Sequence, residues 1–246
     1  MKLKPNERID QIYSQNVKII QNPKMFAFSL DAVALSSFAK IPKNKKTRVV
    51  DLCAGNGVIG LLTQHQTNGM IIEIEIQPQL ADMAKRSIEM NQLDSKIKVL
   101  NIDLKNTYQY IPKDSVDVVT CNPPYFKNLV TSKKNPNPYL AIARHEIKTN
   151  LESTVKIASG LLKMNGKAFF VYRPDRLSDI LIIMRRHRME PKQIRFVYPK
   201  EQKNANIVLI KAIKDGHADG LKILPPLFAY QGNHYSKEVR KMLYGK

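Results

Sequence analysis

The chain alternates short runs of apolar residues with longer segments in which apolar residues recur every three or four positions. The short runs are rich in Val and Ile, and turn-forming residues separate most of them, which is typical of buried strands. The pattern predicts strands at 47–51, 70–76, 97–101, 115–121, 167–172, 193–198 and 206–213.

Several of these strands are separated by segments with the apolar spacing of an amphipathic helix. Thr149 and Glu152 have the spacing of a capping box, so a helix is expected to start there, to run to Met164 and to be ended by Gly166. The apolar spacing predicts further helices over 61–66, 78–90 and 177–187.

The order of the elements predicts an α/β fold with a doubly wound, mostly parallel sheet of seven strands. Parallel strands need crossover connections, and the predicted helices supply them. The strands at 193–198 and 206–213 are joined by a polar loop without a helix, so they should form an antiparallel hairpin at the end of the sheet. We divide the chain into an N-terminal extension packed on the main domain (1–46), the α/β domain (47–214) and a basic C-terminal tail (215–246).

Composition limits where the protein acts. The 246 residues suit one domain with a sizeable core and some additions. Charged residues interrupt the first positions, and no apolar run approaches the roughly 20 residues of a membrane span, so we expect a cytoplasmic protein without membrane association. The two cysteines fit a reducing compartment. Cys53 and Cys121 follow strands expected to be neighbours, and we interpret both as small buried residues; the sequence leaves open whether their thiols are in contact.

The formal charge of +19 is distributed unevenly. Residues 49–84 contain no Lys or Arg, although they contain four acidic residues. Basic residues gather after residue 126, over 185–188 and near the C-terminus, and such a field is typical of a protein that binds a polyanion such as nucleic acid. Each cluster alone could instead be solvated surface, or could offset the dipole of a helix end.

The residues Asn122, Pro123, Pro124 and Tyr125 follow the predicted strand 115–121. An exocyclic amine on a conjugated ring is a poor nucleophile, and two acceptors that bind its N–H groups can redirect its lone pair. The Asn122 side-chain oxygen and the Pro123 carbonyl can be those acceptors, and the Tyr125 ring can stack on a flat base. The motif therefore favours methylation of a planar amine, while the alternative is a plain Pro-Pro turn.

A glycine pattern at Gly55, Gly57 and Gly60 follows the strand at 47–51 and marks a ligand-binding turn. The pattern also fits dinucleotide binding, with Glu75 placed for a ribose. The surplus of acidic side chains favours a cationic sulfonium without phosphates over NAD, although buried strands also exclude basic residues. We assign Asp51 to the methionine ammonium or a water beside it.

Two further acids complete the expected cofactor site. Glu75 lies nearest the end of its strand and is assigned to ribose hydroxyls, while Glu73 points the same way one pleat back. Asp103 is assigned to an adenine amino group, with a solvated turn aspartate as the alternative.

These motifs occur in the order found in class I methyltransferases that use S-adenosylmethionine to methylate amino groups, whose Rossmann-like sheet ends in the same hairpin. Over nearly its full length the chain resembles the bacterial tRNA1(Val) adenine-N6 methyltransferases, and the Firmicutes-type branch most closely. The segments that carry this resemblance are 28–35, 51–57, 75–77, Asp103, 121–126, 143–146 and 223–226.

The resemblance implies methyl transfer from S-adenosylmethionine to N6 of the adenine beside the anticodon, with S-adenosylhomocysteine as product and no metal. The anticodon arm of the tRNA would be the partner, and no protein partner is indicated. Phe28 and Asp31 match a segment that packs beside the cofactor in such enzymes. The expected catalytic residues are Asn122, Pro123 and Tyr125; the expected cofactor-binding residues are Asp51, Gly55, Gly57, Glu75, Asp103 and Asn122; the expected RNA-binding residues are Phe126, Lys127, Lys133, Lys134 and Arg144.

Other activities share the motif. Guanine N2 in ribosomal RNA, adenine in DNA and a release-factor glutamine are also planar amines. Release-factor enzymes have a larger N-terminal domain and less need of positive charge, and DNA enzymes typically add a recognition domain that this chain has no segment to form. A non-catalytic RNA-binding module or an NAD-binding protein would leave the motif at 122–125 unexplained.

Overall fold

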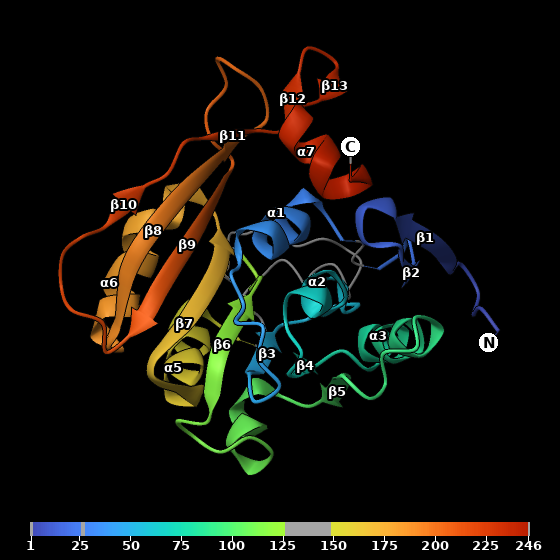
Figure 1. Cartoon of the computed structure of the whole chain (residues 1–246), viewed down its shortest axis with the longest axis horizontal. Helices are drawn as coiled ribbons and strands as arrows, with labels where there is room; N and C mark the ends of the chain where they lie inside the picture. The colour runs from blue at the N-terminus through green and yellow to red at the C-terminus, as the bar shows by residue number, and fades with distance from the viewer. Residues whose placement is uncertain (1, 26–27, 126–148, 246) are drawn as a thin grey trace, which may run out of the picture.

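A computed structural model describes residues 2–25, 28–125 and 149–245. Its main sheet has the order β10-β8-β9-β7-β6-β3-β4-β5, and β11 also pairs with β8 (Figure 1). The seven long strands are β3 (Arg48–Leu52), β4 (Met70–Glu75), β5 (Ile97–Asn101), β6 (Val116–Cys121), β7 (Leu162–Tyr172), β8 (Met189–Tyr198) and β9 (Ile207–Lys214). The two-residue strands β10 (Lys222–Ile223) and β11 (Leu227–Phe228) extend the predicted seven-stranded sheet to nine.

The sheet is parallel from β5 to β7, and β9 lies antiparallel between β7 and β8. This arrangement confirms the doubly wound sheet and its terminal antiparallel hairpin. Side chains of the central strands alternate between two hydrophobic cores, so Val49 and Val118 belong to one while Val50 and Val119 belong to the other. Both faces of the sheet are therefore buried.

Helices from different parts of the chain cover the two faces. One core includes residues of α1 (Leu30–Phe38), α2 (Val58–Thr63), α3 (Pro78–Met90) and α7 (Lys237–Tyr244). The other includes residues of α5 (Leu151–Leu161) and α6 (Leu177–Arg186). Within the described ranges, no helix combines the length and apolarity needed to cross a membrane.

The helix expected from Thr149 to Met164 is shorter than the pattern indicated. Its N-cap is Asn150, whose side chain accepts the N–H of Ser153 at 2.8 Å, and the helix ends at Leu161. Leu162 already has extended backbone angles and pairs with Val116, because its side chain is buried in the same core as the sheet. The strand that was expected to begin at 167 therefore begins five residues earlier.

Additional elements lie at the two ends of the chain. Strands β1 (Arg8–Ile12) and β2 (Val17–Gln21) form an antiparallel hairpin around the 3-10 turn η1 (Tyr13–Gln15). Near the C-terminus, β12 (Tyr230–Gln231) and β13 (His234–Tyr235) form a small hairpin before α7. Figure 1 shows α7 beside α1 and close to the β1–β2 hairpin.

Candidate active site

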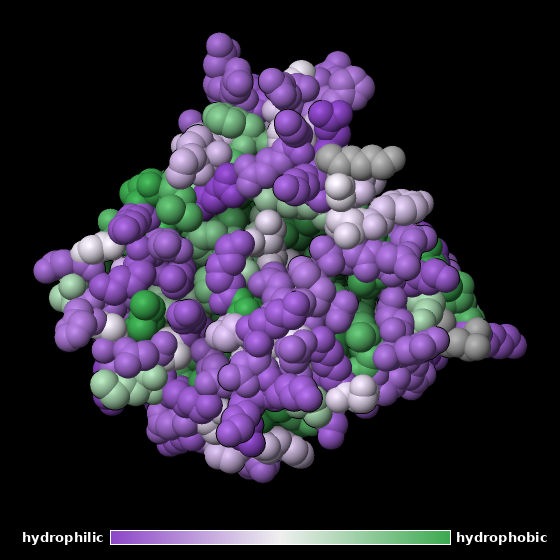
Figure 2. Space-filling view, in the orientation of Figure 1, coloured by the Kyte–Doolittle hydropathy of each residue, from purple (hydrophilic) through white to green (hydrophobic). Residues whose placement is uncertain are grey.

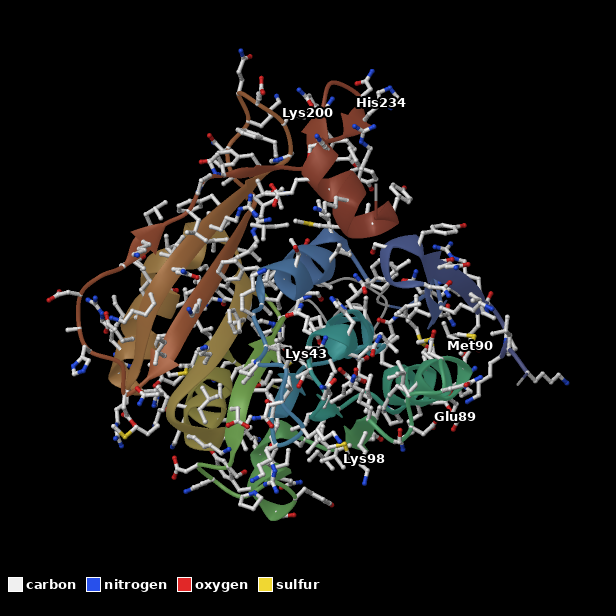
Figure 3. The ribbon with its side chains drawn as sticks, viewed as in Figure 1. Lys43, Glu89, Met90, Lys98, Lys200 and His234 are labelled. Carbon is white, nitrogen blue, oxygen red and sulfur yellow. The ribbon has the colours of Figure 1, made fainter. Side chains whose placement is uncertain are left out.

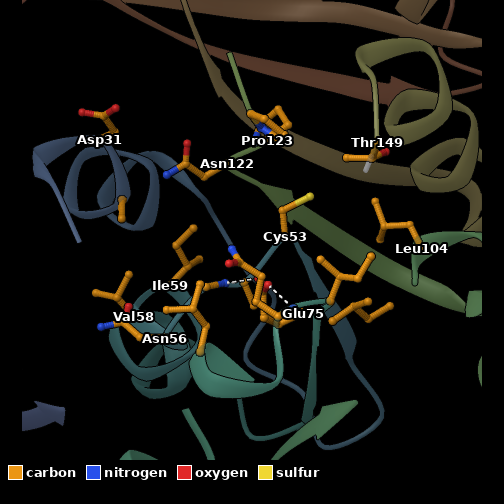
Figure 4. A pocket seen from close by; sticks show the side chains of 18 of the residues that line it. Asp31, Cys53, Asn56, Val58, Ile59, Glu75, Leu104, Asn122, Pro123 and Thr149 are labelled. Carbon is orange, nitrogen blue, oxygen red and sulfur yellow. Dashed lines mark hydrogen bonds between the residues drawn. The ribbon is translucent and has the colours of Figure 1, made fainter. Parts of the chain in front are cut away.

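A cavity of about 350 Å³ lies where β3, β4, β5 and β6 end. Parallel strands place their carboxyl ends at one edge of a sheet, and ligands of open α/β sheets bind there. Figure 4 shows Asn122 and Pro123 on one side of the cavity and Glu75 on the other, with Cys53 between them. Residues expected at the site that line the cavity are Gly55, Glu75, Asp103, Asn122, Pro123 and Tyr125.

The loop after β3 turns sharply under the cavity. Cys53, Gly55 and Gly57 all have positive φ, and Gly57 with φ of 81° is the N-cap of α2. The Glu75 carboxylate accepts the N–H of Gly55 at 2.8 Å and that of Gln77 at 2.7 Å, which ties the loops after β3 and β4 together. These two bonds fix the carboxylate at the cavity wall.

Glu75 is buried, and burial raises its pKa, while the hydrogen bonds from the Gln77 and Gly55 backbone oppose that shift. Gln77 also lines the cavity, and its buried Oε1 has no hydrogen-bond partner among the described residues. A buried acceptor of this kind is expected to have a partner, so it points to a ligand with a donor group. From the sequence, Gln77 could be noted only as part of the segment 75–77.

Asp103 is both a cavity residue and a turn residue, which the sequence had offered as alternatives. It lines the cavity, and its side chain also accepts the N–H of Lys105 at 2.9 Å to cap the 3-10 helix η3 (Leu104–Gln109). The capping bond holds the carboxylate near Ile102 and Leu104, which line the same end of the cavity. A carboxylate beside an apolar wall is suited to a flat ring with an amino group.

The structure does not bring Asp51 or Gly57 to the cavity wall. Asp51 is 1% exposed and accepts the hydroxyl of Thr120 at 2.6 Å, beneath the loop after β3. Burial raises the pKa of Asp51 to about 7, against the opposing hydrogen bond from Thr120, and the nearby Glu75 adds to the rise. Asp51 Oδ2 is buried without a hydrogen-bond partner among the described residues. Because Asp51 is not part of the cavity lining, its position supports the floor of the site.

Glu73 lies still deeper, beside Asp51 in the register of β3 and β4. It is fully buried, and neither carboxylate oxygen has a hydrogen-bond partner within the described part of the chain. Burial, and secondarily the nearby Asp51, raises the pKa of Glu73 well above its ordinary value. The neutral form reduces the large cost of an unpaired buried charge.

Tyr125 makes two side-chain contacts through one hydroxyl. It donates to Asp31 Oδ2 at 2.9 Å and also lies within hydrogen-bond distance of Asn122 Oδ1. Its carbonyl accepts Arg176 Nη1 at 3.0 Å, and its ring meets Tyr172 edge-on with centroids 5.7 Å apart. Burial, and next the charge of Asp31, raises the pKa of Tyr125 well above its ordinary value, so the hydroxyl keeps its proton.

These contacts give Asp31 a larger part in the site than the sequence indicated. Asp31 and Ser29 line the cavity from the start of α1, whereas Phe28 packs against the core and is not part of the lining. Arg173, which directly follows β7, also lines the cavity and was missed. Its place after a predicted strand was the available signal.

The Cys53 and Cys121 side chains lie close enough for Cys53 to influence the Cys121 thiol, a proximity that the sequence left open. Cys121 is fully buried, and burial together with Cys53 raises its pKa well above the ordinary value. Cys53 is only half-buried and lines the cavity, so the expectation that both are buried holds for Cys121 alone. A buried protonated thiol is a poor nucleophile.

Two further points concern metal binding and the expected RNA contacts. Over the described ranges, no group of three or more His, Cys, Asp or Glu side chains is arranged to hold a metal ion. The expected RNA-binding residues Phe126, Lys127, Lys133, Lys134 and Arg144 all lie outside the described residues.

Comparisons with known proteins agree on one class of enzyme. The family model described as "Methyltransferase small domain" matches residues 16–176. The protein named tRNA1(Val) (adenine(37)-N6)-methyltransferase from Aliivibrio salmonicida is 24% identical to this chain. The alignment covers 74% of this chain and 75% of that protein. The protein of that name from Pedobacter heparinus is 30% identical, but the alignment spans only 57% of each chain.

Solved structures share the fold at low sequence identity. A predicted O-methyltransferase from Agrobacterium tumefaciens superposes with a TM-score of 0.68 at 22% identity, covering 87% of this chain and 96% of that one. Geranyl diphosphate C-methyltransferase from Streptomyces coelicolor A3(2), in complex with S-adenosyl-L-homocysteine, gives a TM-score of 0.57 at 13% identity, covering 74% and 78%. At these identities the likeness establishes the fold alone.

Proposed function

The chain belongs to the methyltransferase small domain family, and on that premise we propose that it transfers a methyl group from S-adenosylmethionine to N6 of an adenine in tRNA. We further propose that the target is position 37, beside the anticodon of a valine tRNA. The named relatives support this substrate, and the charge of +19 suits a polyanion. A tRNA substrate implies action in the cytoplasm.

The observation that carries the proposal is the position of Asn122 and Pro123 across the cavity from Glu75. A flat amine can enter between the two acceptors of the motif, while the opposite wall holds the methyl donor. Both prolines have a restricted φ, so the acceptors are held in place before the base arrives.

The lining fits S-adenosylmethionine on two counts. Glu75 and the unpartnered Oε1 of Gln77 can accept ribose hydroxyls, and Asp103 beside Ile102 and Leu104 can accept an adenine amino group. When bound, S-adenosylmethionine supplies an electrophilic methyl group, and S-adenosylhomocysteine remains. We assign no direct contact to Asp51 and Gly57, which support the loop that carries Gly55.

Asn122 and Pro123 would perform the catalytic work by hydrogen bonding. The Asn122 Oδ1 and the Pro123 carbonyl each accept one N–H of the adenine amine, which favours a pyramidal nitrogen with its lone pair directed at the methyl group. Asp31 can hold the Tyr125 hydroxyl at 2.9 Å, so that Asn122 Oδ1 is released for the base. The amine becomes acidic as the new bond forms, so its proton can pass to water without a dedicated base.

An anticodon-loop adenine suits this site because it is unpaired. Extruding it from the loop costs less than removing a base from a duplex, and the Tyr125 ring can stack on it. Phe126, Lys127, Lys133, Lys134 and Arg144 remain the proposed RNA contacts. They follow the motif in sequence, and their cations can bind the phosphates on either side of the target.

The direct test uses the purified protein, S-adenosylmethionine and an unmodified valine tRNA transcript, followed by nuclease digestion and nucleoside mass spectrometry. We expect one N6-methyladenosine per transcript and none when adenine 37 is replaced by guanine. Methylguanosine as the product, or N6-methyladenosine from both transcripts, would contradict the proposed base or position. Transfer to a release factor instead of the transcript would establish the glutamine alternative.

A further inference from the structure

A second concave surface lies between the first 3-10 turn and the last helix, away from the cavity. It has a volume of about 480 Å³ and is lined by Tyr13, Lys237, Arg240 and Tyr244. Tyr13 is 62% exposed and Tyr244 45%, and their ring centroids lie 6.3 Å apart with a tilt of 36°. We refer to these four residues as the tyrosine groove. The groove therefore presents two large exposed rings beside two cationic side chains.

The groove is held in shape by contacts beneath it. Ser14, next to Tyr13, donates its hydroxyl to the carbonyl of Met242 in α7 at 2.5 Å. Val239 is fully buried in the core that includes α1, and Gly245 caps the helix directly after Tyr244. The backbone that carries both rings is therefore packed in place, which lowers the entropy lost when a ligand binds.

The charge of the groove is positive. Glu238 is the acidic residue of α7, and it forms a bidentate pair with Arg195 at 2.7 and 2.8 Å. Lys237 and Arg240 form no ion pair with any residue that the structure describes. Their charges are thus available to an anionic ligand.

The groove and the cavity flank the same helix. Asp31 and Ala32 of α1 line the cavity, and α1 packs against α7. Beyond α7, Tyr230 and Tyr235 stack at 4.8 Å, and Figure 3 shows Lys200 and His234 at this end of the molecule. A strand of nucleic acid that enters the cavity over α1 would continue towards the tyrosine groove.

We propose that the tyrosine groove binds an unpaired nucleotide of the tRNA substrate, with the base stacked on Tyr13 or Tyr244 and the adjacent phosphates bound by Lys237 and Arg240. This inference rests on the proposed function for the identity of the RNA. Exposed aromatic faces beside cations are how proteins bind single-stranded nucleic acid without reading its sequence. An acidic peptide would use the two cations but would not need two exposed rings.

The test measures binding of a fluorescently labelled, unmodified valine tRNA transcript to the full chain without S-adenosylmethionine. We expect Tyr13→Ala and Tyr244→Ala each to raise Kd by about 5-fold or more, the lower bound for loss of one base–aromatic stack. Tyr13→Phe and Tyr244→Phe should bind as the wild type does, because the ring face remains. Replacing both Lys237 and Arg240 by Ala should flatten the dependence of log Kd on log salt by about 0.7 per lost phosphate contact.

Tyr110→Ala with Lys113→Ala is the matched control, since both residues are exposed at another part of the surface. An unchanged Kd for the alanine variants of the groove, or an equal rise for the phenylalanine variants, would overturn the proposal. Because Kd is measured without methyl transfer, this result is independent of the modified base. A failure of the proposed function would appear instead as absence of N6-methyladenosine with the wild type.

Discussion

At the scale of single residues, the Tyr125 hydroxyl links the N-terminal helix to the proposed catalytic amide. One hydroxyl proton serves one acceptor at a time, and the charged Asp31 is a stronger acceptor than the Asn122 amide. With the hydroxyl held by Asp31 at 2.9 Å, the Asn122 oxygen can bind the substrate amine. Asp31 is thus a positioning residue for an acceptor that it does not contact itself.

Asp31→Asn tests this role, because it preserves size but removes the charge. We expect kcat to fall about 10-fold, the lower end for loss of a hydrogen bond to a charged group. The thermal unfolding temperature should stay close to that of the wild type. In a Tyr125→Phe background the same substitution should have little effect, since the hydroxyl that it positions is gone. Equal losses in both backgrounds, measured by single-turnover methyl transfer, would contradict the coupling.

Asp51 predicts a pH dependence of stability. Its pKa is raised to about 7 in the folded protein, against about 3.9 in an unfolded chain. The folded state therefore binds a proton that the unfolded state has lost, and the free energy of unfolding declines as pH rises from 4 to 7, by at most about 4 kcal/mol.

Asp51→Asn should make this decline shallower, because the amide does not titrate. The measurement is urea unfolding of the protein at several pH values between 4 and 7. Asp94→Asn, at an exposed position, is the matched control and should leave the slope unchanged. If Asp51→Asn also leaves it unchanged, the proposed burial of a titrating carboxyl under the site is wrong.

At the scale of elements, glycines in the loop after β3 and in helix α2 leave room for the buried Glu73 side chain. A Cβ added at Gly60 would lie 2.0 Å from Glu73 Oε1, and one added at Gly57 would lie 2.7 Å from Oε2 and also require positive φ. The glycines therefore let α2 approach β4 closely. The close approach of α2 to β4 positions the Gly55 backbone N–H for its hydrogen bond to the Glu75 carboxylate.

Gly60→Ala should destabilise the protein by about 1–3 kcal/mol, the usual effect of overpacking a core, and should weaken S-adenosylmethionine binding in calorimetry. The matched control is the same substitution in a Glu73→Ala background, where the added methyl group has room. A penalty of the same size in both backgrounds would show that the contact with Glu73 is not its cause.

Element order was readable from the sequence because it depends on local periodicity. Helix α3 has the predicted bounds of 78 and 90, and β5 those of 97 and 101. The end of α5 was not readable, since Leu161 and Leu162 are both buried and only tertiary pairing with Val116 turns the second into a strand residue.

Some residues of the site could likewise be predicted from the sequence, and others could not. Glu75, Asp103 and Asn122, which line the cavity, could be predicted because they lie at or just after the ends of strands, and strand ends converge at one edge of a sheet. Asp51 also follows this rule, but its side chain points below the cavity, and a shift of one pleat is not visible in a motif. The contact of Asp31 with Tyr125 joins residues 94 positions apart, which no local pattern encodes.

At the scale of the whole molecule, charge is divided according to the two ligands. The cavity wall near Glu75 and Asp103 is acidic and apolar, which suits a cationic cofactor. The exterior carries the excess of Lys and Arg, and Figure 2 shows a largely hydrophilic face. Salt should therefore weaken tRNA binding far more than cofactor binding, because tRNA binding involves many phosphate contacts.

In the proposed mechanism, Asn122 accepts a hydrogen bond from the amine that becomes methylated. The most direct measurement compares the wild type with Asn122→Ala, scoring N6-methyladenosine in the valine tRNA transcript by mass spectrometry and S-adenosylmethionine affinity by calorimetry. Asn106→Ala, at an exposed position, is the control. We expect Asn122→Ala to lose turnover by about 100-fold or more with cofactor affinity nearly unchanged. Turnover equal to that of the wild type would contradict the claim.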